Sequence, residues 1–200
     1  APVPGNPENR IMSPEGPTHN IVSWQASDPE TLAETKVFSL HRKWVTSSND
    51  PSRCGEFVYL DAPDWVNVIA LTADDRVVLI EQFRHGIQEI TLEIPGGSVD
   101  PGEAPLHGGL RELREETGYD GVDGRIIGVV APNPAIINNR CHTVLVRGVK
   151  VVGPPQLEGY EDIHTKLVPL VDVPDLIRSG AICHSLVIAA FHHFDLRTGE

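Results

Sequence analysis

The stretch of sequence that decides the fold runs from Gly97 to Tyr119 and reads GSVDPGEAPLHGGLRELREETGY. Its early part, Pro101-Gly102-Glu103, is typical of a turn. Pro105 suits the first turn of a helix, where its missing backbone N–H costs nothing. Gly118 can end that helix because glycine readily adopts a left-handed conformation. The spacing therefore predicts a helix of about three turns between Pro105 and Gly118.

Three carboxylates of this helix are spaced so that they share one face. Glu112, Glu115 and Glu116 stand at positions i, i+3 and i+4. Like charges so placed repel by about 0.2–0.5 kcal/mol per pair, and a hard divalent cation would reverse the sign of that interaction. Because all of these ligands are oxygens, the pattern favours Mg²⁺, or Mn²⁺, over zinc. The alternative interpretation is a solvated acidic face on which Arg111 bridges to Glu115.

The composition of the whole chain is that of an ordinary globular protein. At 200 residues it is long enough for one domain, or for one domain with a small appendage. Its net charge of −12 argues against a nucleic-acid-binding surface, which would show a basic stripe. The three cysteines are widely spaced and odd in number, which favours a reducing cytoplasm. No apolar run approaches the roughly 18 residues of a membrane span, so we expect no membrane partner.

The pattern along the chain predicts an extended arm followed by a mixture of strands and helices. Residues 1–20 contain five prolines, which disfavour regular structure. Apolar runs between polar turns predict strands at residues 35–45, 56–61, 66–72, 77–82, 89–94, 125–130, 142–149 and 165–170. After the helix described above, helical spacing returns at residues 173–179 and 183–196. Strands with helices on either side imply an α/β sandwich.

Residues 97–119 resemble the Nudix box, G-x5-E-x7-R-E-U-x-E-E-x-G-U, in which U is a bulky aliphatic residue. Eight fixed positions match, namely Gly97, Glu103, Arg111, Glu112, Leu113, Glu115, Glu116 and Gly118. Only the last position departs from the pattern, because Tyr119 replaces an aliphatic residue. An aromatic ring can fill the same apolar position.

The resemblance extends beyond the box to one branch of the Nudix family. Gln82-Phe83-Arg84 and Leu92-Glu93-Ile94-Pro95-Gly96-Gly97 look like the ADP-ribose and nucleoside-diphosphate-sugar pyrophosphatases. A proline past the box marks that branch, and here Pro132 and Pro134 bracket the expected place. Relatives in this branch often have an acidic residue shortly beyond the proline, whereas residues 133–140 of this chain contain none.

The resemblance implies a fold and a division of the chain. The fold is a Nudix α/β/α sandwich with a mixed sheet, preceded by a small N-terminal antiparallel sheet. Residues 1–23 would form the Pro-rich arm, residues 24–62 an N-terminal β subdomain, and residues 63–200 the Nudix hydrolase domain. In relatives the small sheet often contacts the second subunit of a homodimer and helps cover the base, so we expect a homodimer here.

The same resemblance implies a role for the matching residues. Glu112, Glu116 and the backbone carbonyl of Gly96 would be direct metal ligands, and Glu115 would be a ligand or a close neighbour. Glu103 and Arg111 would hold the loop and the helix together through a charge-assisted pair. Four residues of the motif would thus be structural: Gly97, Glu103, Arg111 and Gly118.

Three residues outside the helix are candidates for binding the substrate. Arg84 could bind a phosphate through its bidentate fork, although an exposed strand-end cation is an equal alternative. Glu93 belongs to the motif that precedes the box. Arg140 follows two asparagines in a loop, where positioned polar side chains are often functional, but a solvated loop charge is also open.

The general base is expected outside the box, because the box glutamates would be occupied by metal. The next acidic stretch is Glu158-Gly159-Tyr160-Glu161-Asp162, in which Gly159 gives the loop freedom to close over a ligand. Glu161 is the first candidate for the base and Glu158 the second. A solvated loop is the alternative, and in that case the base would be Glu115 or Glu112.

These observations predict a Mg²⁺-dependent pyrophosphohydrolase that acts on a small-molecule nucleotide. The expected substrate is ADP-ribose or a related nucleoside diphosphate sugar, cleaved to a nucleoside monophosphate and a sugar phosphate. A nucleoside triphosphate, a dinucleoside polyphosphate or coenzyme A is the alternative substrate. A nucleotide-sensing module that does not cleave its ligand is a further alternative, but it would be expected to have a degraded box, and this box keeps all four glutamates.

Overall fold

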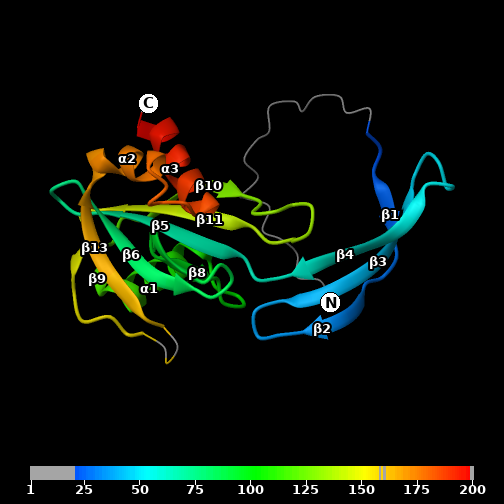
Figure 1. The fold of residues 1–200 in the computed structure, drawn as a ribbon, viewed down its shortest axis with the longest axis horizontal. Coiled ribbons are helices and arrows are strands. Elements are labelled where there is room, and N and C mark those ends of the chain that lie inside the picture. Colours follow the sequence, from blue (N-terminus) through cyan, green and yellow to red (C-terminus); the bar gives the residue numbers. More distant parts are fainter. Residues whose placement is uncertain (1–20, 158, 160, 199–200) are drawn as a thin grey trace.

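The structure is a computed structural model that describes residues 21–157, 159 and 161–198. Residues 1–20 of the arm predicted for residues 1–23 lie outside the described residues. Glu158 also lies outside them. Two larger sheets are visible in Figure 1. The first four strands form a small sheet, which extends away from a larger sheet that carries the helices.

The small sheet is antiparallel and is centred on β3 (Ser39–Ser47). β4 (Cys54–Asp61) pairs along one edge of β3, and β1 (Trp24–Ala26) and β2 (Glu30–Glu34) share its other edge. The strands predicted at 35–45 and 56–61 correspond to β3 and β4. β3 begins later than predicted because Thr35 closes a turn, in which its hydroxyl donates to Phe38 O (2.7 Å).

The main sheet has seven strands and is mixed. Across it lie, in order, β10 (Arg125–Val130), β11 (Cys141–Arg147), β5 (Trp65–Leu71), β6 (Arg76–Arg84) and β13 (Ile163–Pro169). β7 (Glu89–Glu93) also pairs with β6, and β8 (Gly96–Ser98) pairs with β5. Only β11 and β5 run parallel among the described pairs. A separate two-stranded ribbon joins β9 (Tyr119–Asp120) and β12 (Lys150–Val151).

Helices cover both faces of the main sheet, as Figure 1 shows. α1 (Pro105–Thr117) packs on one face, and α2 (Val173–Arg178) and α3 (Ser185–Thr198) pack on the other. A short 3-10 turn, η2 (Leu170–Asp172), leads into α2. The predicted α/β sandwich with a mixed sheet and a small antiparallel sheet in front of it is confirmed. Each of the six strands predicted between residues 66 and 170 overlaps an observed strand.

The main sheet packs against a helical layer on each face, because successive strand residues point to opposite faces. On β5, Val66 and Val68 belong to the cluster that contains Leu113 of α1, whereas Ile69 belongs to the cluster that contains Phe191 of α3. All five side chains are buried. Strand alternation in the sequence therefore places α1 and α3 on opposite sides of the sheet.

A glycine lets α1 lie close to the sheet. A Cβ atom on Gly109 would stand only 2.9 Å from Val66 Cγ2. Such a distance is shorter than van der Waals contact allows, so a larger residue would push the helix outward. The close approach sets the position of the carboxylates on α1 relative to β8.

The small sheet is tied to the main body at the loop that follows β10. Leu60 N–H donates to Ile136 O (2.7 Å), and Asn138 N–H donates to Leu60 O (3.2 Å). The Asn138 amide also donates to Asp61 Oδ1 (2.6 Å). Between this loop and the small sheet lies a groove of about 720 Å³, lined by Trp24, Lys43, Val45, Phe57, Val58, Tyr59 and residues 134–138.

Within the described part of the chain, the helices are too short or too polar to cross a bilayer.

Candidate active site

The box helix forms as predicted and ends where predicted. Pro105 occupies its first turn, and Gly118 adopts a left-handed conformation with φ of 71°. The Gly118 N–H donates to Arg114 O (2.9 Å), which closes the last turn. Glu112, Glu115 and Glu116 therefore project from consecutive turns of one short, well-terminated helix, next to the strand β8.

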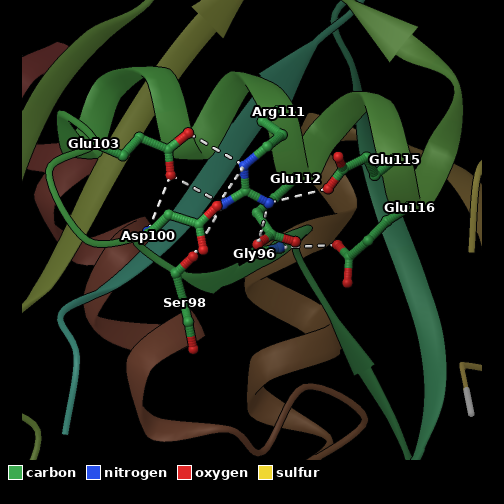
Figure 2. A network of polar contacts seen from close by, with 8 residues as sticks. All are labelled: Gly96, Ser98, Asp100, Glu103, Arg111, Glu112, Glu115 and Glu116. Carbon is green, nitrogen blue, oxygen red and sulfur yellow. Dashed lines mark hydrogen bonds and ion pairs between the residues drawn. The ribbon is translucent and has the colours of Figure 1, made fainter. Parts of the chain in front are cut away.

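Arg111 is the centre of a polar network that joins the loop to the helix (Figure 2). It donates Nε–H to Glu103 Oε1 (3.1 Å) and Nη2–H to Glu103 Oε2 (3.0 Å). Its Nη1 donates to Glu112 Oε1 (2.9 Å) and to Glu115 Oε2 (3.0 Å). A further bond runs from Nη2 to Ser98 O (3.1 Å). These acceptors, Glu103 foremost, raise the pKa of Arg111, so the guanidinium is a permanent cation.

The bridge from Arg111 to Glu115 is the contact expected for a solvated acidic face, but the face itself is not solvated. Glu116 is only 5% exposed, and the side chain of Glu112 is 15% exposed. Glu115 remains the most open of the three, at 41%. A buried carboxylate such as Glu116 is costly unless a cation pairs with it, and Arg111 pairs with Glu112 and Glu115 instead. The burial therefore favours an interpretation as a binding site over a surface charge pattern.

Burial also raises the pKa of these two groups. Loss of solvation raises the pKa of Glu116 to about 8, and repulsion from Glu112 and Glu161 adds to this effect. The Gly96 N–H, which donates to Glu116 Oε2 (2.9 Å), opposes it. Desolvation likewise raises the pKa of Glu112, although Arg111 partly offsets the shift. A cation between these carboxylates would restore their ionised form.

The donor set fits a hard divalent cation. The oxygens come from the buried Glu116 and the partly buried Glu112, and Gly97 packs directly against the Glu112 carboxylate. A Cβ on Gly97 would stand 2.5 Å from Glu112 Oε1, so a larger residue there would displace the Glu112 carboxylate. Among the described residues, no three His, Cys, Asp or Glu side chains are already grouped as a metal site. Glu115 is turned toward Arg111.

Arg84 lies at the end of β6 and forms a fork with Glu93 of β7. Its Nε–H donates to Glu93 Oε1 (2.8 Å) and its Nη2–H to Glu93 Oε2 (2.7 Å). The guanidinium is partly exposed, whereas Glu93 is buried. Arg84 also lies within electrostatic reach of Glu116. The charge of Arg84 therefore acts on one carboxylate of α1, that of Glu116.

The other predicted site residues are less closely connected to the carboxylates of α1. Glu161 is exposed, but its charge raises the pKa of both Glu112 and Glu116, so it lies near them. Glu158 is outside the described residues. Arg140 makes local contacts: its backbone N–H donates to Asp64 Oδ1 (2.8 Å) and its Nη1 to Asn139 O (3.2 Å). None of the contacts described for Arg140 reaches α1.

Two contributors to the site were not predicted from the sequence. Thr91 donates its hydroxyl to Glu93 Oε1 (2.6 Å), and His184 Nδ1 lies 3.1 Å from Glu93 Oε2. The strand pattern could have indicated the contact of Thr91, because residues two apart on β7, such as Thr91 and Glu93, share one face of the strand. His184 is distant in the sequence and belongs to no motif, so no signal in the sequence points to it.

The structure is an α/β/α sandwich whose box helix carries Glu112, Glu115 and Glu116. A family model described as the NUDIX domain matches residues 63–189, and the chain belongs to the Nudix family. The family predicted from the sequence is therefore confirmed, and with it the class of enzyme, a Nudix hydrolase.

Individual relatives agree with this assignment. The ADP-ribose pyrophosphatase of Bacillus subtilis is 27% identical over 176 residues, which cover 85% of this chain and 94% of the relative. The ADP-sugar pyrophosphatase of Mus musculus is 40% identical over 140 residues, or 62% and 64% of the two chains. A solved structure of an ADP compounds hydrolase has a TM-score of 0.73 at 22% identity and covers 89% of this chain and 95% of its own. At that identity the structure supports the fold alone.

Proposed function

We propose that this protein is a Mg²⁺-dependent pyrophosphohydrolase that cleaves ADP-ribose or a related nucleoside diphosphate sugar. The observation that carries the proposal is the pair of carboxylates on the box helix, the buried Glu116 and the partly buried Glu112, together with the electrostatic interaction of Glu116 with Arg84. Relatives named ADP-ribose pyrophosphatase and ADP-sugar pyrophosphatase support the substrate class. The products would be a nucleoside monophosphate and a sugar phosphate.

The reaction is the attack of water on one phosphorus of the P–O–P bridge. A new P–O bond forms from the water oxygen, the bridging P–O bond breaks, and the proton of the water passes to a base. Glu112, Glu116 and the carbonyl of Gly96 would hold Mg²⁺, and Mn²⁺ could replace it. When bound, the cation supplies charge neutralisation at the phosphate oxygens and makes the attacking water more acidic.

Other residues would bind the substrate, hold the carboxylates in place and accept the proton. Arg84 presents a guanidinium that can bind a phosphate oxygen, because Arg favours bidentate recognition of phosphates. Arg111 and Glu103 hold the loop that carries Ser98 against the helix, which keeps the carboxylates in place. Glu161 is the proposed base, because its charge already acts on Glu112 and Glu116. Glu158, or Glu115 within the box, is the alternative.

We also propose a homodimer and a cytoplasmic location. Large apolar side chains are exposed on the small sheet, as expected if a second copy covers it: Trp24, Leu32, Trp44, Phe57 and Val58. All three cysteines of the chain are free thiols, which supports a reducing compartment. Residues 24–62 would form the subdomain that contacts the second subunit.

The experiment that tests the proposal is a comparison of substrates at fixed enzyme and Mg²⁺ concentration. ADP-ribose, other nucleoside diphosphate sugars, nucleoside triphosphates, a dinucleoside polyphosphate and coenzyme A are each incubated, and products are separated by chromatography. We expect ADP-ribose or another nucleoside diphosphate sugar to give the highest kcat/KM, with a nucleoside monophosphate as product. Faster turnover of triphosphates would refute the substrate class. Binding of ADP-ribose without turnover would instead identify a sensing module.

A further inference from the structure

The carboxylate of Glu93 is contacted by three side chains that come from different elements, two through hydrogen bonds and His184 through an ion-pair contact. Arg84 belongs to β6, Thr91 to β7, and His184 directly precedes α3. Only 3% of the Glu93 side chain is exposed. Arg84 and Thr91 bind its oxygens directly, and His184 Nδ1 lies 3.1 Å from Oε2, on the same oxygen that accepts from Arg84 Nη2. A carboxylate so deeply buried is tolerated because it is paired and hydrogen-bonded.

This environment makes Glu93 unsuited to contact a diphosphate itself. Although burial alone would raise its pKa, hydrogen bonds from Arg84, His184 and Thr91 hold the pKa of Glu93 well below its usual range. At neutral pH it is therefore an anion that offers only acceptors. A phosphate oxygen is also an anionic acceptor, so the two groups repel. The assignment of Glu93 to substrate binding stays a prediction, and the geometry favours a role in orienting Arg84.

The imidazole of His184 projects from a firmly held point of the backbone. The His184 carbonyl accepts the N–H groups of Val187 and Ile188 at 3.1 Å each, so the residue begins the first turn of α3. Val187 and Phe191 then anchor the helix in the buried core on that face of the sheet. His184 therefore connects the core packing of α3 to Glu93, and through Glu93 to the guanidinium of Arg84.

We propose that His184 is a positioning residue for phosphate binding by Arg84. By holding Oε2 of Glu93, it fixes the plane of the Arg84 guanidinium so that the remaining nitrogen faces the acidic side of α1. This role rests on the proposed function, in which the diphosphate lies between Arg84 and the box carboxylates. His184 does not touch the substrate, and its effect passes through two other side chains.

The test compares three substitutions of His184 that differ in where they place a donor. His184→Asn keeps an amide N–H close to the position of Nδ1, His184→Gln moves the donor outward by one methylene, and His184→Ala removes it. We expect kcat/KM for the nucleoside diphosphate sugar to fall by about 10-fold or more in the Ala and Gln variants, as for other residues that orient a binding group. The Asn variant should stay within about threefold of the wild type. Unfolding midpoints are measured for each variant.

A double-mutant cycle separates positioning from general stabilisation. In an Arg84→Ala background, His184→Ala should cause no further loss of kcat/KM, because the group that it positions is absent. A residue that merely stabilises the fold would lower activity in both backgrounds. Wild-type activity in His184→Ala, additive losses in the cycle, or an Asn variant as impaired as the Ala variant would overturn the proposal.

A spectroscopic readout does not depend on turnover. The Nε–H group of Arg84 is hydrogen-bonded to Glu93, so its NMR signal should be shifted and slow to exchange in the wild type and in His184→Asn. The signal should be lost or averaged in His184→Ala and His184→Gln. An unchanged Arg84 signal in all variants would overturn the positioning role. A wild type that hydrolyses no diphosphate while these signals behave as expected would refute only the proposed function.

Discussion

Two arginines interact with the carboxylates of α1. Arg111 lies within the box, where it binds Glu103, Glu112 and Glu115 at the same time. Arg84 comes from β6 and interacts electrostatically with Glu116. Arg111 donates to three protein carboxylates. Arg84 donates Nε–H and Nη2–H to Glu93, and its side chain remains partly exposed. This division leaves Arg84 as the arginine that can bind a substrate phosphate.

The proposed base gives the first prediction. Glu161→Gln should lower kcat by about 10²-fold or more while KM changes little, because proton transfer contributes about 10²–10⁴-fold in the transition state. Glu158→Gln is the matched control in the same acidic loop and should keep kcat within about threefold of the wild type. A crippled Glu158→Gln enzyme beside an active Glu161→Gln enzyme would transfer the role to Glu158. Full activity in both would place the base within the box.

The buried pair between Glu93 and Arg84 gives a prediction about pH and stability. Because the pKa of Glu93 is lowered on folding from its ordinary value of 4.5, the ionised carboxylate stabilises the fold above that pH. The stabilisation is lost as the pH falls below 4.5. Glu93→Gln should therefore cost about 1.5–3 kcal/mol at pH 7 and progressively less in acid. Denaturant unfolding at several pH values checks this.

The control for this measurement is Glu89→Gln, on the same strand. Glu89 is exposed at the start of β7, so its substitution should leave the free energy of unfolding nearly unchanged across the same pH range. A cost for Glu93→Gln that is the same at pH 3 and pH 7 would contradict the assignment of an ionised, stabilising Glu93.

Local spacing in the sequence predicts only part of this site. The shared face of Glu112, Glu115 and Glu116 follows from helical periodicity, so the sequence alone is enough to predict it. The burial of Glu116 and the partial burial of Glu112 do not follow from periodicity, because they depend on how closely α1 lies against β5 and β8. The contact of His184 with Glu93 joins segments far apart in the chain, and only the packing of α3 on the sheet brings them together.

At the level of elements, β10 and α3 fit together through a glycine. The ring of His193 lies against Gly128, where a Cβ atom would stand 2.2 Å from His193 Cδ2. Gly128 also stands at a register shift between β10 and β11. The contact allows α3 to lie flat on this end of the sheet, on the face opposite the box helix.

This contact predicts that Gly128→Ala destabilises the fold by about 1–3 kcal/mol, as overpacking usually does. Gly55→Ala in the strand β4 is the control, because a Cβ there meets no atom within 4 Å and the change should cost little. Thermal unfolding of both variants checks the difference. If the clash is the cause, Gly128→Ala should cost much less in a His193→Ala background. An equal cost in both backgrounds would contradict this explanation.

The elements of the main sheet could be predicted well because most of its strands are apolar runs bounded by turns. β5 is buried along most of its length and β6 along its first half, and such runs are distinctive. β1 and β2 were missed, because they are short and fully exposed, so no apolar pattern marks them. β8 was also missed, since Gly96 and Gly97 disfavour a strand in isolation and pair only because β5 lies beside them.

The small sheet has little buried core of its own, and several of its large aromatic and aliphatic side chains are exposed. We therefore expect a homodimer in which a second copy covers part of this surface. Sedimentation velocity should show a species of twice the chain mass of 21.8 kDa. Phe57→Glu and Trp44→Glu on exposed positions should shift the population toward monomer. A species of 21.8 kDa at every concentration would contradict the dimer.

In the proposed mechanism, Glu112 and Glu116 of the box helix hold the metal ion that drives hydrolysis. The most direct test is Glu116→Gln, which keeps the shape of the side chain and removes its charge. We expect the variant to remain folded, to bind Mg²⁺ or Mn²⁺ more weakly in calorimetry, and to lose at least about 10²-fold in kcat on the best nucleoside diphosphate sugar. A folded Glu116→Gln enzyme with wild-type turnover in saturating Mg²⁺ would contradict the account.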